Sequence, residues 1–249
     1  MKPSALRCFA ACLFLSAATA AELGTLSPEQ VLKQSRDTYV ALTSYADTGS
    51  VTTRYHSGRA PESVETYTFR TAYQTPRQFL FDFKKGMDAG AERFVIWSEG
   101  QDFNSWWSAT QVHEDYPQGQ GANAFALSAY PTQESSVMIP ALLFSKAGLQ
   151  GPLSSFTLLK GAGTEKLGEH LCYRLIGQEA MAYKTGTVAG GRAVTLWIDA
   201  ETLLMRKIFE DTPDGDGGDI LNTVTTSFEP VANPAIDPTR FHFEVPKRR

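Results

Sequence analysis

The sequence predicts a mainly β protein in which about eleven antiparallel strands form a strongly curved sheet with covering helices. The clearest evidence is the run from Val194 to Glu210, where two β-rich segments flank a polar turn at residues 199–202. Alternation with a period of two, bounded by turn residues, is typical of a β-hairpin. Most of the chain repeats this design with short connections, so neighbouring strands are expected to pair antiparallel.

One helix is expected near the start of the mature chain. Ser27 suits the N-cap, Pro28 the first turn, and Gln30 can complete a capping box. An apolar stripe at helical spacing follows, and it needs a surface to cover, for which the sheet is the obvious partner. The stripe consists of Val31, Ser35, Tyr39 and Leu42.

Strands are expected over 45–55, 63–74, 77–84, 92–99, 102–110, 154–160, 170–178, 191–199, 203–210, 219–229 and 240–245. Residues 110–132 have a poorer pattern and are interpreted as a loop with a short helix over 122–130. A second helix is expected over 137–147, where Pro140 would lie within the first turn and be tolerated.

Large apolar side chains occur on both faces of the predicted sheet. Phe79, Phe81 and Phe83 share one face of a strand, whereas the neighbours Trp106 and Trp107 must point to opposite sides. One interpretation is an ordinary core, and the other is an apolar cavity between a curved sheet and its helices, which would hold an apolar ligand. The residues expected to line this cavity are Tyr67, Phe69, Phe79, Phe81, Phe83, Phe94, Trp97, Trp107, Leu143, Phe144, Trp197 and Phe209.

The first twenty residues resemble a secretory signal peptide. Lys2 and Arg7 precede an apolar segment, and residues 18–20 form a small-residue cleavage site before Ala21. A single membrane anchor is the alternative, but the apolar segment is shorter than the roughly 20 residues that a span needs. We therefore expect an exported protein that does not span the membrane, with one domain over residues 21–249.

The mature chain would carry 21 basic and 27 acidic residues, a net charge of −6. This charge provides no electrostatic footprint for nucleic acid or for an anionic membrane. Cys172 would be the one remaining cysteine, so no internal disulfide is expected, and its alternating context indicates a small buried residue rather than a nucleophile.

No familiar catalytic, phosphate-binding or metal-binding motif occurs in the sequence. Residues 119–124 match G-x-G-x-x-A, but they follow no strand of a βαβ unit. The acidic residues of the 212–219 segment lack the glycine and glutamate that an EF-hand loop requires, so a hairpin turn is preferred. The cluster at residues 113–115 is interpreted as a solvated loop. We expect no enzyme activity, no cofactor and no metal.

Five segments, in this order along the chain, resemble those of one family: 75–81, 99–107, 139–143, 197–207 and 228–243. They are a proline-containing hairpin before an aromatic strand, a glycine turn before two tryptophans, the start of a helix, a Trp-Ile-Asp hairpin and the closing strands. Together they resemble the periplasmic outer-membrane lipoprotein carrier (LolA/LolB-like) superfamily. Thr75 stands where the lipoprotein carrier has an arginine, so the resemblance implies a relative rather than the carrier itself.

The resemblance implies a LolA-like unclosed antiparallel β-barrel of eleven strands, with helices packed in its mouth as a lid over a hydrophobic cavity. It also implies a non-catalytic periplasmic binding protein whose ligand is a lipid acyl chain or an acylated protein, with an envelope protein as a further partner. The alternative on the same fold is a protein-interaction or envelope-stress sensor module.

Overall fold

The computed structural model describes residues 26–56, 62–86, 91–117, 138–144, 156–179, 192–213 and 220–247. Within these residues, one antiparallel sheet holds all of the strands in the order β6-β5-β4-β3-β2-β1-β11-β10-β9-β8-β7, with β12 beside β1. The strands are β1 (Ser44–Tyr55), β2 (Ser63–Gln74), β3 (Gln78–Lys85), β4 (Arg93–Glu99), β5 (Phe103–Trp107), β6 (Val112–Tyr116), β7 (Phe156–Leu167), β8 (His170–Glu179), β9 (Arg192–Asp199), β10 (Met205–Pro213), β11 (Ile220–Phe228) and β12 (Val231–Ala232).

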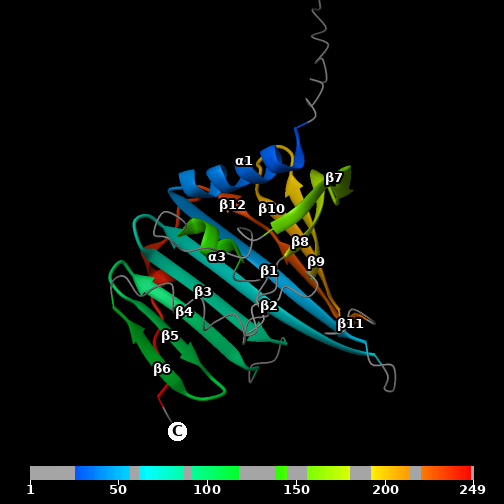
Figure 1. Ribbon diagram of the computed structural model, residues 1–249. Coiled ribbons are helices and arrows are strands. Elements are labelled where there is room, and N and C mark those ends of the chain that lie inside the picture. The colour runs from blue at the N-terminus through cyan, green and yellow to red at the C-terminus, as the bar shows by residue number, and fades with distance from the viewer. Residues whose placement is uncertain are drawn as a thin grey trace, which may run out of the picture.

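The sheet is open, because β6 and β7 form its two edges and do not pair with each other. Most pairs are consecutive hairpins, and the pairing of β1 with β11 joins the two halves. The right-handed twist of each strand makes a sheet of this size coil. Figure 1 shows the sheet curving around the two helices. The face toward the helices is called the concave face below, and the opposite face the convex face. The predicted unclosed antiparallel sheet is confirmed.

Helix α1 (Pro28–Ala41) begins as its sequence predicts. The Ser27 hydroxyl accepts a hydrogen bond from the Gln30 backbone N–H at 3.3 Å, and the Gln30 side chain accepts one from the Ser27 N–H at 2.8 Å. This reciprocal pair satisfies two amide groups that the first turn leaves without helical partners. Val31 and Tyr39 each retain 1% exposure, so the expected stripe is buried against the concave face.

Helix α3 (Met138–Leu143) lies beside α1 within the curve of the sheet (Figure 1). Ile139 is fully buried, and Leu142 and Leu143 retain 5% exposure, as expected for a short apolar helix held by tertiary packing. The helix expected over 137–147 is thus observed over 138–143. The helix expected over 122–130, the G-x-G-x-x-A match, the turn residues 214–219 and the signal peptide lie outside the described residues.

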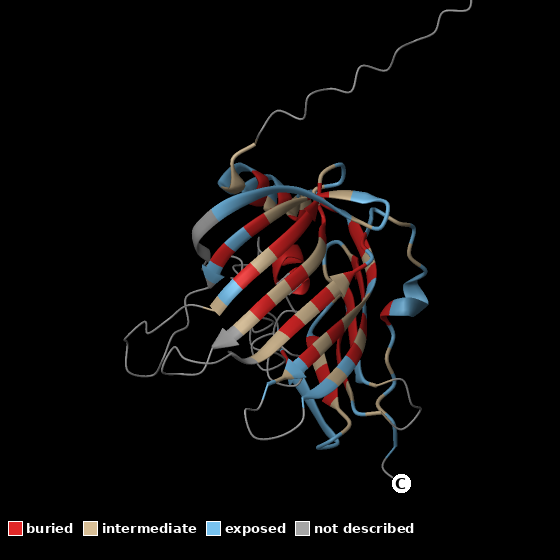
Figure 2. Cartoon of the chain, turned by 90° about the vertical axis from the view of Figure 1, so that its right-hand side faces the viewer, coloured by how far each residue is buried: buried red, intermediate tan, exposed pale blue. Residues whose placement is uncertain are grey.

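The C-terminal segment covers part of the convex face, where Figure 2 shows it running outside the sheet. The strand expected over 240–245 is wrong: the chain forms the 3-10 helix η4 (Pro238–Phe241) and then continues without strand pairing. Its alternation arises from packing on a sheet face, not from a hydrogen-bonded ladder. Ile236, Phe241, Phe243 and Val245 pack with Ala72, Leu80, Val95, Trp97 and Trp106 in a second apolar cluster.

The loop expected at residues 110–132 is wrong for its first part, which forms edge strand β6. Four of its five residues are exposed, and only Tyr116 is buried. A polar edge strand has no apolar alternation, so the pattern used to find strands cannot detect it. His113, expected in a solvated loop, stacks on the Trp97 ring with centroids 5.4 Å apart.

Candidate functional site

The concave face of strands β2 to β5 carries a continuous aromatic surface. Strand register places Phe69 opposite Phe83, Phe83 opposite Phe94, and Phe94 opposite Trp107, which makes one row across four strands. Side chains in register on the same face of neighbouring strands are in contact distance. We call the following set the aromatic face: Tyr67, Phe69, Phe79, Phe81, Phe83, Phe94 and Trp107.

The rings of the aromatic face contact one another directly. Tyr67 and Phe83 stack with centroids 5.2 Å apart, and Phe81 lies 6.2 Å from Phe83 and 6.0 Å from Phe69. Phe69 also meets Phe228 of β11 edge-on at 5.5 Å. Each such pair contributes about 0.5–1.5 kcal/mol beyond area burial. The aromatic face is therefore a preorganised apolar surface that extends onto the other half of the sheet.

Gly49 of β1 leaves room for this arrangement. A Cβ atom at this position would lie 2.2 Å from the Phe69 ring and 2.3 Å from the Ser227 carbonyl oxygen. Both distances are far below van der Waals contact. Glycine here leaves room for the end of the Phe69 ring beside the β1 backbone, from where the ring meets Phe228.

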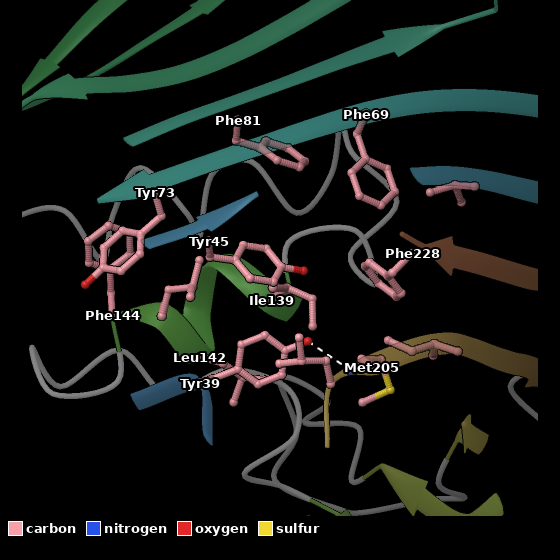
Figure 3. Close-up of a cluster of buried hydrophobic side chains, with 14 of the residues drawn as sticks. Tyr39, Tyr45, Phe69, Tyr73, Phe81, Ile139, Leu142, Phe144, Met205 and Phe228 are labelled. Carbon is pink, nitrogen blue, oxygen red and sulfur yellow. Dashed lines mark hydrogen bonds between the residues drawn. The ribbon is translucent and has the colours of Figure 1, made fainter. Parts of the chain in front are cut away.

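The helices close one end of the aromatic face. Phe144, which follows α3, meets Tyr73, Phe79 and Phe103 edge-on, each at 5.2 Å between centroids. Figure 3 shows the residues of this end converging from α1, α3 and the sheet. From α1, Tyr39 packs on Tyr45 at 5.6 Å, and its oxygen accepts a hydrogen bond from the Met205 N–H at 3.0 Å.

A buried carboxyl group lies beneath α1. The Tyr45 hydroxyl donates to the Asp47 carboxylate at 2.7 Å, and the Thr71 N–H donates at 3.1 Å. Tyr39 hydrogen-bonds to Tyr45 in turn, so the chain of contacts runs from the helix to the carboxylate. Burial raises the pKa of Asp47 to about 6, because the charged form loses its water and no described residue supplies a cation in exchange.

The opposite end of the aromatic face carries a polar rim. Glu65 accepts hydrogen bonds from the hydroxyls of Tyr67 and Tyr55 and from the Lys85 ammonium, the last at 2.9 Å. These hydrogen bonds lower the pKa of Glu65, and the bond from the Tyr67 hydroxyl has the largest effect. The indole N–H of Trp107 donates to Glu92 at 2.7 Å. This end therefore presents apolar rings bordered by charged groups.

Nine of the twelve residues expected to line a cavity belong to the concave core. Eight are buried in its apolar cluster, and Trp107 packs against it while partly exposed. The nine are Tyr67, Phe69, Phe79, Phe81, Phe83, Phe94, Trp107, Leu143 and Phe144.

The expectation that all twelve share one lining does not hold for Trp97, Trp197 and Phe209. Trp97 lies in the convex cluster beneath the C-terminal segment. Trp197 pairs with Lys207 in register, and its ring lies between the cations of Lys207 at 4.4 Å and Arg174 at 5.8 Å. Phe209 follows Lys207 by two residues and shares its face, since β-strands alternate. The apolar character of all three predicts burial but does not specify the sheet face.

Several concave residues were missed by the sequence prediction. Tyr39, Ile139 and Leu142 belong to the helices, where helical spacing predicts burial but not a place in a site. The others lie in strands, whose alternation does not specify which face meets the helices. The missed residues are Tyr39, Tyr45, Tyr73, Phe103, Ile139, Leu142, Leu196, Met205, Ile208 and Phe228.

Cys172 and the candidate metal ligands of the described residues can be placed in the structure. Cys172 is fully buried, and burial raises the pKa of its thiol to about 11, which disfavours the reactive thiolate. Within the same residues, no group of three or more His, Cys, Asp or Glu side chains is placed to hold a metal ion. No helix of the described part is long and apolar enough to cross a membrane.

Neither protein-family models nor curated proteins match this sequence. Solved structures do match. Lipoprotein LppX of Mycobacterium tuberculosis is 14% identical with a TM-score of 0.44, over 83% of this chain and 95% of that one. LprF of Mycobacterium bovis is 12% identical with a TM-score of 0.43, over 84% and 96%.

A LolA superfamily protein of Nitrosomonas europaea is 7% identical with a TM-score of 0.31, over 88% of this chain and 98% of that one. With TM-scores below 0.5, these likenesses assign no ligand and no activity to this chain. The structures that this protein is similar to thus include LppX, LprF and a LolA superfamily protein, the last as the sequence motifs predicted.

Proposed function

We propose that this protein is a non-catalytic binding protein of the periplasm that holds a lipid acyl chain, free or attached to a protein, against its aromatic face. The observation that carries the proposal is the unbroken row of rings across β2 to β5 on the concave side of an open sheet. An open edge and a separate helical cover allow the sheet and helices to part without breaking strand pairs.

The energetics favour a long apolar ligand. Burial of apolar surface contributes about 25 cal/mol per Å², so an acyl chain that buries a few hundred Å² gains several kcal/mol before ordering costs. Phe81 is fully buried in the structure, so a ligand must displace groups that now cover the rings. Such displacement predicts slow, saturable binding rather than simple surface adsorption.

The two ends of the aromatic face suggest how the ligand is oriented. The end near Phe144 is apolar and covered by α3, which suits the methyl end of an acyl chain. The end near Lys85 and Glu65 is polar, which suits a headgroup or the attached protein. An amphiphile placed this way buries its tail and leaves its charge in water.

Two adjacent tryptophans provide a matched test. Trp106 and Trp107 are consecutive residues of β5 on opposite faces. Two single-tryptophan variants are compared, each keeping one of the pair, with phenylalanine at the other three tryptophan positions. Both are titrated with a fatty acid brominated on its chain, which quenches an indole only at close contact.

We expect saturable quenching of Trp107 with a stoichiometry near one, and little quenching of Trp106. Equal quenching of both indoles would indicate micelle adsorption and would contradict the proposal. Absence of quenching in both, with far-UV circular dichroism unchanged, would also refute it.

The proposed location has its own test. N-terminal sequencing of protein recovered from the cell envelope should find Ala21 as the first residue, as the small-residue site at 18–20 predicts. Recovery of a chain that begins at Met1 from the soluble cell interior would contradict a periplasmic role.

A further inference from the structure

A second hollow lies on the convex face, separated from the aromatic face by the sheet itself. It has a volume of about 500 Å³ and extends over the adjacent strands β3, β2, β1 and β11. This volume falls within the range of small-molecule sites, which is roughly 300–1,000 Å³. The C-terminal segment contributes no residue to its lining.

The floor of the hollow consists of small hydroxyl side chains. Thr48 and Ser50 come from β1, Thr68 from β2 and Ser227 from β11. Within the described chain, none of these four hydroxyls forms a hydrogen bond with another protein group. Each hydroxyl can both donate and accept, so the floor offers four unused hydrogen-bonding groups side by side. The threonine methyl groups between them add apolar contact.

One wall of the hollow is cationic. The Asp82 carboxylate is nearly fully buried and accepts from the guanidinium groups of both Arg93 and Arg70, at distances of 2.6–2.9 Å. Two cations around one carboxylate leave a net positive charge. Lys84 adds a second positive charge to this wall, since its side chain is exposed and forms no ion pair in the described chain. At the far end, Glu229 is 73% exposed and lies 3.5 Å from Arg206.

We propose that this hollow binds a soluble phosphorylated sugar. Its phosphate lies against Lys84 and Arg70, where the local charge is positive and a guanidinium and an ammonium can both donate. The hydroxyl groups of the sugar lie on the floor formed by Thr48, Ser50, Thr68 and Ser227. The Glu229 carboxylate accepts a hydrogen bond from the sugar hydroxyl at the far end. Because the hollow is shallow, part of the ligand stays hydrated, and affinity in the millimolar range is expected.

This site is independent of the acyl-chain site. Phe69 contributes to the lining of the hollow, but strand alternation directs its ring to the concave side, and the sheet separates the hollow from the other rings of the aromatic face. Binding of the sugar phosphate should therefore persist when the aromatic face is occupied or altered.

The test uses glucose 6-phosphate as the probe, with glucose and inorganic phosphate as comparisons. Binding is followed by amide chemical shifts of the ¹⁵N-labelled mature protein. We expect saturable shifts on β1, β2 and β11 with glucose 6-phosphate, and weaker binding of glucose or phosphate alone.

Consecutive lysines give a matched pair of variants. Lys84→Ala removes a cation from the hollow, whereas Lys85→Ala removes one from the opposite face, where Lys85 bonds to Glu65. Lys84→Ala should weaken binding by about tenfold or more, the usual effect of losing a hydrogen bond to a charged group. Lys85→Ala should leave it unchanged, and Thr68→Val should weaken it about fivefold.

Three results would overturn the proposal. The first is no saturable shift with glucose 6-phosphate while the protein remains folded. The second is equal loss of affinity in the two lysine variants, which would indicate a nonspecific charge effect. The third is binding to vesicles containing phosphatidylglycerol that depends on Lys84 while the sugar phosphate does not bind, which would assign the hollow to a membrane headgroup.

Discussion

Replacing Asp47 with asparagine should make the protein more stable at neutral pH, although it removes a buried and hydrogen-bonded carboxylate. Asp47 retains 3% exposure, and its partners are the Tyr45 hydroxyl and the Thr71 N–H, with no cation in contact among the described residues. Ionisation of this group therefore costs free energy in the folded state that it does not cost in the unfolded chain.

The magnitude follows from the pKa. The pKa of Asp47 is raised from 3.8 to about 6 by burial, and each unit corresponds to about 1.4 kcal/mol. Between these two values the folded state binds more protons than the unfolded state, so stability falls as pH rises. The contribution of Asp47 to the stability of the fold is most favourable below about pH 4. Above about pH 7, the folded state is about 3 kcal/mol less stable than it would be if the pKa of Asp47 were not shifted.

Asparagine cannot ionise, and its side-chain oxygen can still accept from the Thr71 N–H. Urea unfolding followed by far-UV circular dichroism should show Asp47→Asn to be about 1–3 kcal/mol more stable than the wild type at pH 8. The difference should shrink steadily toward pH 4, because the wild-type carboxyl becomes neutral there.

Asp82→Asn is the matched control. Asp82 is equally buried but accepts from Arg70 and Arg93, so loss of its charge should destabilise the protein at pH 8, the opposite sign. If Asp47→Asn lowers stability at pH 8, or if its effect is the same at pH 4.5 and pH 8, the inferred cost of ionising Asp47 is wrong.

Three further changes test the packing. Gly49→Ala would place a Cβ 2.3 Å from a strand carbonyl oxygen and 2.2 Å from the Phe69 ring, so it should cost about 3 kcal/mol of stability in urea unfolding; an unchanged midpoint would contradict the close approach. Phe243→Ala should cost about 2 kcal/mol and shift tryptophan emission to longer wavelength, and an unshifted spectrum would show that the C-terminal segment does not cover the convex cluster. Cys172→Ser should leave acyl-chain binding within about threefold, since its raised thiol pKa gives no nucleophile, and total loss of binding in the folded variant would overturn this reading.

Local pattern was sufficient to find most elements. The capping residues Ser27 and Gln30 marked the start of α1, and alternation located the long strands within a few residues because one face of each is buried. The failures have a common cause. Edge strand β6 is polar because it lies at the margin of the sheet, and residues 241–245 alternate without being a strand because they pack on a face.

The candidate site depended on tertiary structure more than the elements did. Sequence alone determined that the sheet has apolar groups on both faces and that helices must cover one of them. Which face each residue occupies was decided by strand register and by the curvature of the sheet, which depend on pairings such as β1 with β11, about 170 residues apart in the chain. Register placed Trp107 with the concave rings and Trp97 beneath the C-terminal segment, although both are tryptophans in adjacent strands. Period-two alternation fixes which residues share a face within one strand, and only long-range pairing relates that face to the helices.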